Sequence, residues 1–268
     1  MKRVRQAVSL PAGRKLYPSS RGGAIPAAFS ILGMLTTLIA IIFTLVLVVG
    51  VPALSYSTAR KSEIRTMPRL DLYLSAVLSL WLLTAVGLGV VYLIARKVFV
   101  KGFAVMPLSL ALEWGTGIAV AALLALGLVI WCERRGWLPR ESDLTYLLIP
   151  ETPREKVWAV LILAPTAAFC EEFLFRGYLL TQLHDWLHSL LWAWVVSSLA
   201  FGLAHFYQGW SGMTRAGLLG ALLAYPVVCW GSLYPSMLAH WMIDTVALVW
   251  LGPWMVHKDD ADEGRMLE

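Results

Sequence analysis

Long hydrophobic runs separated by short polar segments make up most of the chain. In the first half, runs begin near residues 24, 72 and 107, and each extends for more than about 17 residues. A helix of that length crosses the hydrocarbon core of a bilayer. We therefore predict N-terminal transmembrane helices over residues 27–132. A basic arm, residues 1–26, precedes them, and the first run is too long for the apolar part of a cleaved signal peptide.

A charged connection with several prolines, residues 133–156, separates this half from a second hydrophobic region over residues 157–251. The spans expected in the second region begin at about 157 and then lie at about 190–206, 213–231 and 235–251. A polar C-terminal tail, residues 252–268, follows them. The chain is thus predicted to form two groups of membrane helices joined by a segment in water or at the interface.

Composition agrees with a membrane protein. Hydrophobic residues make up 59% of the 268 positions and charged residues only 15%, whereas soluble proteins carry about a quarter charged residues. Residues 178–190 mix polar side chains with leucines, so we predict an amphipathic helix at the membrane interface there. The expected fold is all-α, a polytopic transmembrane bundle of about seven to eight spans with the functional site in the C-terminal half.

Charge and cysteine content exclude some partners. The formal net charge is +5, and Lys and Arg gather at the ends of hydrophobic runs, where they can meet anionic lipid headgroups. Nucleic acid is therefore not an expected partner. Cys132, Cys170 and Cys229 lie in or beside hydrophobic runs at spacings that match neither a disulfide framework nor a thiolate metal site. We interpret them as packing residues.

Five ionisable residues interrupt the hydrophobic runs of the second half, on three separate predicted helices. They are Glu171, Glu172, His205, His240 and Asp244. Glu172 lies four residues before Arg176, the favoured order for an ion pair within a helix. Glu171 points about 100° away around the helix axis. With Glu172 paired, Glu171 becomes the candidate general base of a site.

The two histidines stand in their own spaced pairs. Phe201 precedes His205 by four residues, and His240 precedes Asp244 by four, which places each pair on one helix face. A single membrane histidine often only bonds a backbone carbonyl, and a single Glu–Arg pair often only locks helices together. Burying five ionisable groups in a membrane costs free energy. A protein that keeps all five on three helices is therefore expected to use them together in one functional site. The pair of His184 and His188, and also Glu113, are much weaker candidates.

These three spaced motifs, in this order on successive helices, resemble the CAAX prenyl protease and bacteriocin-processing family, also called the CPBP or Abi family. The resemblance covers about residues 157–250. It implies a membrane-embedded endopeptidase, and we expect an integral protein of a bacterial plasma membrane. Its expected partners are a membrane-associated peptide or protein substrate and the lipid bilayer.

The resemblance also implies roles for individual residues. Glu171 and His205 would activate a water molecule for attack on the scissile carbonyl, and His240 with Asp244 would stabilise the resulting oxyanion. Glu172, Arg176 and Phe201 would support them. Prenyl-protein proteases of the family commonly carry Asn where this chain has Asp244. An ionised Asp244 would repel an oxyanion, so it is expected either to be protonated or to accept a hydrogen bond from His240 and orient it.

Two alternatives stay open. Glu171, His205 and His240 could instead bind zinc, a ligand set that suits metal-assisted hydrolysis. We favour the metal-free version, with no cofactor, because the chain lacks an HExxH helix and places Arg176 beside the acids. The buried groups could also serve a non-catalytic membrane partner or a transporter. The substrate, whether a prenylated C-terminus, a leader peptide or a membrane protein tail, is left open by the sequence.

Overall fold

The computed structural model describes residues 31–94, 104–139 and 143–255, and within these ranges the chain is a bundle of helices. The predicted all-α transmembrane bundle is confirmed. The predicted basic arm, residues 1–26, lies outside the described residues, as does the predicted tail from residue 256 onward. The first residues of that predicted tail are helical, because α12 (Gly252–Met255) continues the last helix.

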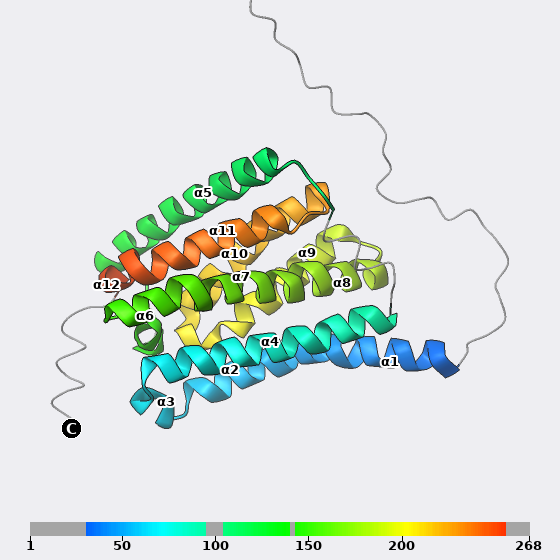
Figure 1. Ribbon diagram of the computed structural model, residues 1–268, viewed down its shortest axis with the longest axis horizontal. Helices are drawn as coiled ribbons and strands as arrows, with labels where there is room; N and C mark the ends of the chain where they lie inside the picture. The colour runs from blue at the N-terminus through cyan, green and yellow to red at the C-terminus, as the bar shows by residue number, and fades with distance from the viewer. Residues whose placement is uncertain (1–30, 95–103, 140–142, 256–268) are drawn as a thin grey trace, which may run out of the picture.

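Two long antiparallel helices form one side of the bundle. The first consists of α1 (Ile31–Leu45), the π-helical turn η1 (Val46–Gly50) and α2 (Val51–Ala59), and the short α3 (Glu63–Thr66) leads into α4 (Arg69–Ile94). Figure 1 shows this first helix beside α4 at the bottom of the bundle. Their outer faces carry exposed leucines such as Leu38 and Leu82, which is the pattern expected where a helix faces lipid.

The opposite side is formed by α5 (Leu108–Arg134), which packs along α11 (Tyr234–Val246). In Figure 1 these two helices lie at the top. The contact depends on Gly115, because a Cβ atom there would come 2.8 Å from Leu238 Cδ2. Small residues at a helix crossing let two membrane helices approach closely.

One helix of 35 residues, Pro153–Leu187, runs through the middle of the bundle. It follows the short 3₁₀ segment η2 (Asp143–Leu148) and begins at a capping box, in which Thr152 and Glu155 each accept a hydrogen bond from the other's backbone N–H. Its consecutive segments are α6 (Pro153–Trp158), η3 (Ala159–Leu163), α7 (Ala164–Glu171), η4 (Glu172–Leu179) and α8 (Leu180–Leu187).

The prediction of an interfacial helix over residues 178–190 is wrong for residues 178–183. Residues 178–183 are the last part of the central helix, and all six side chains are buried within the bundle. The physical reason is that a helix packed on several neighbours can carry the same mixture of leucines and polar residues as one lying at an interface. Helix α9 (Leu190–Ala204) then turns back beside α8.

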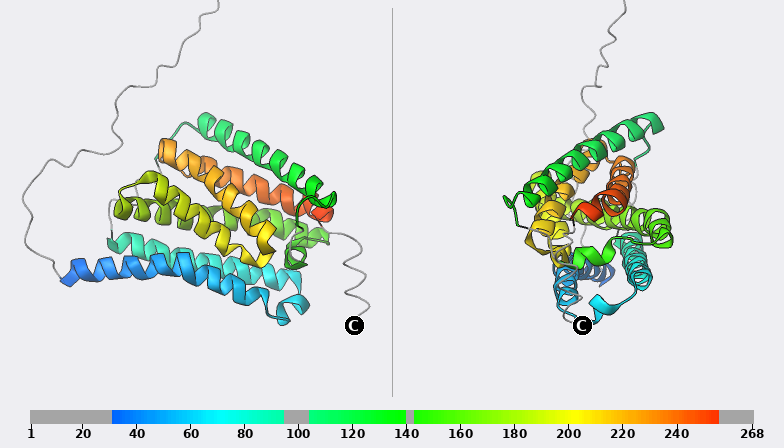
Figure 2. Two further views of the ribbon diagram at one scale, coloured as in Figure 1. Left: turned by 180° about the vertical axis from the view of Figure 1, so that it is seen from behind. Right: turned by 90° about the vertical axis from the view of Figure 1, so that its left-hand side faces the viewer.

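The last helices complete the wall behind the central helix. The 3₁₀ turn η5 (Phe206–Gln208) joins α9 to α10 (Gly209–Trp230), and α11 continues through η6 (Ala247–Leu251) into α12. Figure 2 shows α10 crossing the back of the bundle obliquely. Helices α9 and α10 touch at Gly202, where an added Cβ would lie 2.8 Å from the Met213 carbonyl oxygen. The missing side chain of Gly202 therefore lets α10 approach α9 closely.

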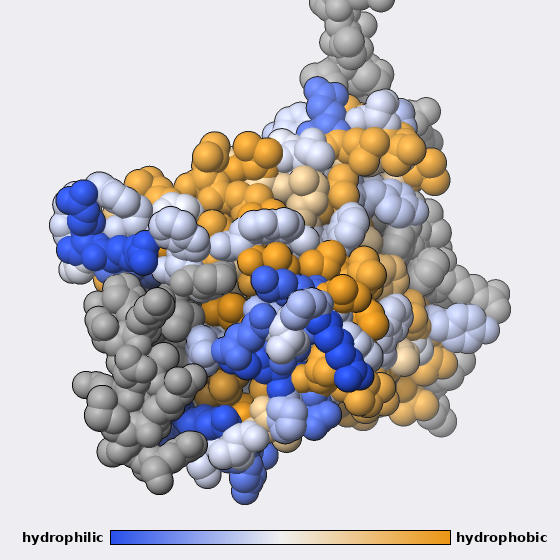
Figure 3. Space-filling view, turned by 60° about the vertical axis from the view of Figure 1, so that its left-hand side comes forward, coloured by the Kyte–Doolittle hydropathy of each residue, from blue (hydrophilic) through white to orange (hydrophobic). Residues whose placement is uncertain are grey.

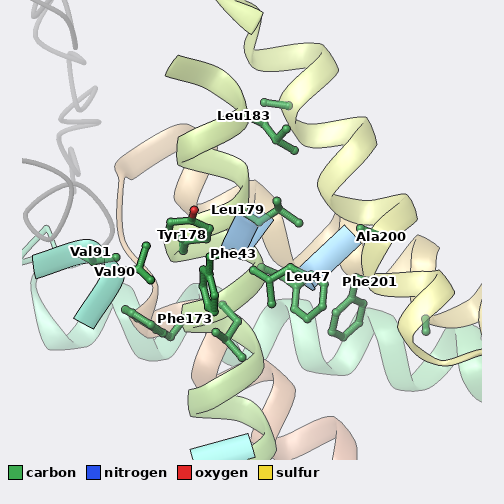
Figure 4. Close-up of a cluster of buried hydrophobic side chains, with 14 residues drawn as sticks. Phe43, Leu47, Val90, Val91, Phe173, Tyr178, Leu179, Leu183, Ala200 and Phe201 are labelled. Atoms are coloured by element: carbon green, nitrogen blue, oxygen red, sulfur yellow. The ribbon is translucent and has the colours of Figure 1, made fainter. Parts of the chain in front are cut away.

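The largest apolar cluster ties the first helix to the central one. Phe43 and Leu47 pack against Phe173 and Leu179, and Figure 4 shows these side chains pointing toward one another. The buried Tyr178 hydroxyl donates to the Ala40 carbonyl at 3.0 Å. The N-terminal helices therefore hold the segment that follows Glu171 and Glu172 in the chain.

Five helices among the described residues are long and apolar enough to cross a membrane. They are Gly33–Thr58, Arg69–Leu93, Leu108–Arg134, Pro153–Leu187 and Phe206–Trp230. About seven to eight spans were expected, and one of the remaining expected spans, α9, is a shorter apolar helix of 15 residues. Figure 3 shows hydrophilic side chains gathered toward one end of the bundle, with hydrophobic side chains on its flanks. The protein is an integral membrane protein.

Candidate active site

The two adjacent glutamates stand where the central helix changes its winding. Glu171 ends α7, and Glu172 opens the π-helical segment η4. Their side chains leave the helix in different directions. Glu172 is fully buried, whereas Glu171 is partly exposed to a cavity. Local widening of a helix is a frequent feature of functional sites, because it changes which side chains share a face.

Glu172 joins two other helical positions into one buried chain of polar groups. Its Oε1 atom lies 3.0 Å from Arg176 Nη1 and 2.8 Å from His240 Nδ1. The Arg176 guanidinium also lies 4.0 Å from the centre of the Phe201 ring, at cation–π distance. The ion pair expected from the spacing is present. The bond to His240 was not expected, since those residues are 68 positions apart.

Glu171 faces both imidazoles. Its Oε2 atom is 3.9 Å from His205 Nε2 and 3.8 Å from His240 Nε2. Within the part of the chain that the structure describes, this buried oxygen accepts no hydrogen bond. His205 Nδ1 is 2.9 Å from the Phe201 carbonyl, so Nδ1–H donates there and Nε2 is left as an acceptor.

Asp244 completes the group from the next turn of α11. Its Oδ2 atom lies 3.4 Å from His240 Nε2. The Phe201 ring packs between the groups, with its centre 4.6 Å from the ring of His205 and 6.2 Å from that of His240. The structure thus brings together all the site residues named from the sequence, from three helices and the turn that ends α9.

These groups line one end of a cavity of about 410 Å³. Its other walls are mainly apolar and come from both halves of the chain, including Leu80 of α4, Leu126 of α5 and Leu219 of α10. Four polar residues that the sequence did not single out also line it. They are Thr145, Tyr207, Gln208 and Arg215. Tyr207 and Gln208 directly follow His205 by two and three positions, which is the signal that could have drawn attention to them.

The weaker candidates lie elsewhere. His188 ends α8 with a left-handed backbone (φ 50°), and neither it nor His184 lines the cavity. Glu113 is exposed on α5 and is also outside the cavity wall. The three cysteines are free thiols, and Cys170 is buried beside Glu171 in the helix.

The residues can be tested against the zinc alternative. Glu171, His205 and His240 are of the types that bind zinc in hydrolytic enzymes, and both imidazoles present Nε2 to the carboxylate. Their spacing is different from that of a metal site: among the described residues, no three His, Cys, Asp or Glu side chains are arranged to hold a metal ion.

Comparison with known proteins agrees with the motifs. Residues 153–246 match the family model described as type II CAAX prenyl endopeptidase Rce1-like. Comparison with the curated proteins and with the solved structures gave no match. The matched residues contain Glu171, His205, His240 and Asp244, and the match confirms the resemblance seen in the three motifs. The helical segment 153–246 of this membrane protein is therefore similar to the type II CAAX prenyl endopeptidase Rce1-like family.

Proposed function

We propose that this chain is an intramembrane endopeptidase that hydrolyses a peptide bond of a membrane-associated peptide or protein. One observation carries the proposal: a buried carboxylate and the acceptor nitrogen of an imidazole face each other across 3.9 Å in the wall of an otherwise apolar cavity. A water molecule between Glu171 and His205 would have an acceptor for each of its protons, which raises its nucleophilicity. A serine or cysteine nucleophile is not required.

The reaction follows from this placement. The water oxygen attacks the scissile carbonyl carbon, and its proton passes to Glu171. The leaving nitrogen later takes that proton as the C–N bond breaks. His205 keeps the orientation needed for the first step because the Phe201 carbonyl holds its Nδ1–H. A low-dielectric cavity strengthens each of these electrostatic interactions.

His240 and Asp244 act on the negative charge that develops on the carbonyl oxygen. When protonated, His240 has an Nε2–H that faces Glu171 and Asp244, and this donor can stabilise the negative charge that develops on the carbonyl oxygen. Asp244 at 3.4 Å is placed to accept from the same nitrogen, which supports the orienting role over that of a protonated acid. Glu172 fixes the ring from its other side through Nδ1.

Cleavage assays on the purified protein in liposomes test the proposal. The substrates are a farnesylated peptide ending in Cys-aliphatic-aliphatic-X, the same peptide without the farnesyl group, and a hydrophobic leader peptide. We expect at least one to be cleaved, and Glu171→Gln to lower the rate about 100-fold or more. Glu113→Gln is the matched control and should leave it unchanged. Equal rates for both variants, or cleavage of none, would instead favour a non-catalytic membrane partner or transporter.

Dependence on metal is a separate prediction. We propose the metal-free, glutamic version because the described side chains lack the spacing of a zinc site and Arg176 lies beside the acids. After dialysis against a strong chelator, the protein is expected to keep its full cleavage rate. Loss of activity that one equivalent of zinc restores would support the zinc enzyme instead.

A further inference from the structure

Tyr207 stands in the candidate active site without a role so far. It lies two residues after His205 in the turn η5 and lines the same cavity as Glu171 and Asp244. The centre of its ring is 6.0 Å from that of His205. The phenol is therefore near the atoms proposed to react.

Contacts on both its backbone and its hydroxyl fix this tyrosine. Its backbone N–H donates to Ser55 Oγ at 3.1 Å, and Ser55 belongs to α2. The Gln208 side-chain Nε2 donates to the Tyr207 hydroxyl oxygen at 3.0 Å. Because Gln208 supplies the hydrogen of that bond, the tyrosine's own O–H remains available to an acceptor in the cavity.

The site needs such a donor. Both ring nitrogens of His240 already face carboxylates: Nδ1 is bonded to Glu172, and Nε2 lies between Glu171 and Asp244. An oxyanion forming beside His240 would be repelled by the charge of Asp244 and would share the Nε2–H donor with that carboxylate. A neutral hydroxyl that is already oriented can stabilise it without adding another negative group.

We propose that Tyr207 is a further catalytic residue, whose hydroxyl donates a hydrogen bond to the oxyanion of the tetrahedral intermediate. The inference rests on the proposed function. In the first step the water oxygen bonds to the carbonyl carbon, its proton moves to Glu171, and the π electron pair moves onto the carbonyl oxygen, which accepts the bond from Tyr207. When the C–N bond breaks, that pair re-forms the carbonyl and the nitrogen takes the proton from Glu171.

Tyr207→Phe tests the inference, because it removes the hydroxyl and keeps the ring in place. With the peptide from the panel above that the unmodified protein cleaves fastest, kcat should fall about 100-fold, the usual effect of losing one oxyanion donor. KM should stay within about twofold, since the bond forms only in the transition state. Gln208→Leu, which frees the hydroxyl to rotate, should lower kcat by a smaller factor.

Tyr225→Phe is the matched control. That tyrosine is outside the cavity wall and packs against Trp114 and Trp230, so its loss should leave kcat unchanged. A Tyr207→Phe protein with unaltered kcat, or one whose KM and thermal stability change while kcat does not, overturns the inference. If Glu171→Gln is inactive in that case, the endopeptidase proposal is kept and only the role of Tyr207 is rejected. If Glu171→Gln cleaves normally, both proposals are rejected.

Discussion

Among single residues, the site is organised by charged side chains that are buried away from water, where a charge is unfavourable in lipid and in a protein interior alike. Arg176 and Glu172 have side chains 1% and 0% exposed. Taking such groups out of water costs several kcal/mol for each ion, and only mutual pairing with further hydrogen bonds offsets that cost. Here Arg176 lies on the Phe201 ring and His240 bonds the second side of Glu172. Removing one member should leave the others uncompensated.

Arg176→Met is therefore predicted to lower the free energy of unfolding by about 3–5 kcal/mol, because it leaves a buried carboxylate without its cation. Denaturant-induced unfolding in mixed micelles measures the change. The matched control is Arg69→Met, which breaks the 2.7 Å pair with Glu151, whose carboxylate lies near the surface with its side chain 51% exposed. Surface pairs contribute about 0–1 kcal/mol. If both variants lose a similar free energy of unfolding, the buried pair contributes no more to stability than the pair of Arg69 and Glu151.

Residue-level features differ in how far the sequence can reveal them. The bond from Glu172 to Arg176 follows from a four-residue spacing on one helix, so it could be predicted. The bond from Glu172 to His240 joins two helices, and no local pattern encodes how they are rotated toward each other. Tyr207 was missed because tyrosine near the end of a membrane helix is ordinary at an interface.

At the scale of elements, the α9–α10 crossing decides where His205 stands. A Cβ atom at Gly202 would lie 2.8 Å from the Met213 carbonyl oxygen and 3.0 Å from Gly217 Cα, both of them backbone atoms. A backbone contact of this kind can be relieved only by moving one helix. Since His205 follows Gly202 by three residues, such a movement would carry the imidazole away from Glu171.

Gly202→Ala is expected to destabilise the protein by about 1–3 kcal/mol, as overpacking typically does. It should also reduce the cleavage rate, measured on the same preparation. Gly117→Ala in α5 is the control, since a Cβ atom there meets nothing within 4 Å. That variant should be neutral or slightly more stable, because alanine favours a helix over glycine. Equal stability of the two variants would contradict the importance of the crossing.

The limits of helix prediction appear in the central helix. The hydrophobic runs that begin near residues 72 and 107 correspond closely to α4 and α5, because a run of apolar residues fixes the length of a membrane helix. Residues 178–183 were placed at the interface but are buried, since amphipathicity shows that two faces differ and says nothing about what covers each. Only the tertiary packing shows which helices cover each face of this segment.

At the scale of the whole molecule, the cavity belongs to both halves of the chain. The family match covers only residues 153–246, yet Ala76 of α4 and Ala125 of α5 also line the cavity. The N-terminal helices carry no recognisable motif, so their part in the site could not be predicted from the sequence. Their side chains contribute to the shape of this cavity.

Filling that space from α5 should impair the enzyme without unfolding it. Ala125→Phe is predicted to lower kcat/KM at least about tenfold, because a misplaced substrate loses the alignment that the reaction needs. Leu124→Phe, at a neighbouring position that is 72% exposed on the outer surface, should change kcat/KM less than about twofold. The peptide assay described above measures both. Equal kcat/KM in the two variants would exclude the cavity as the substrate site.

In the proposed mechanism, Glu171 and His205 act as one unit on one water molecule. A double-mutant cycle on kcat tests it, using Glu171→Gln, His205→Gln and the combined variant with the same peptide. Each single change should lower kcat about 100-fold or more, and the double variant should be only slightly slower than either, because removing one partner already disables the unit. Losses that multiply in the double variant, or a single variant with the full rate, would show that the two residues do not act as one unit.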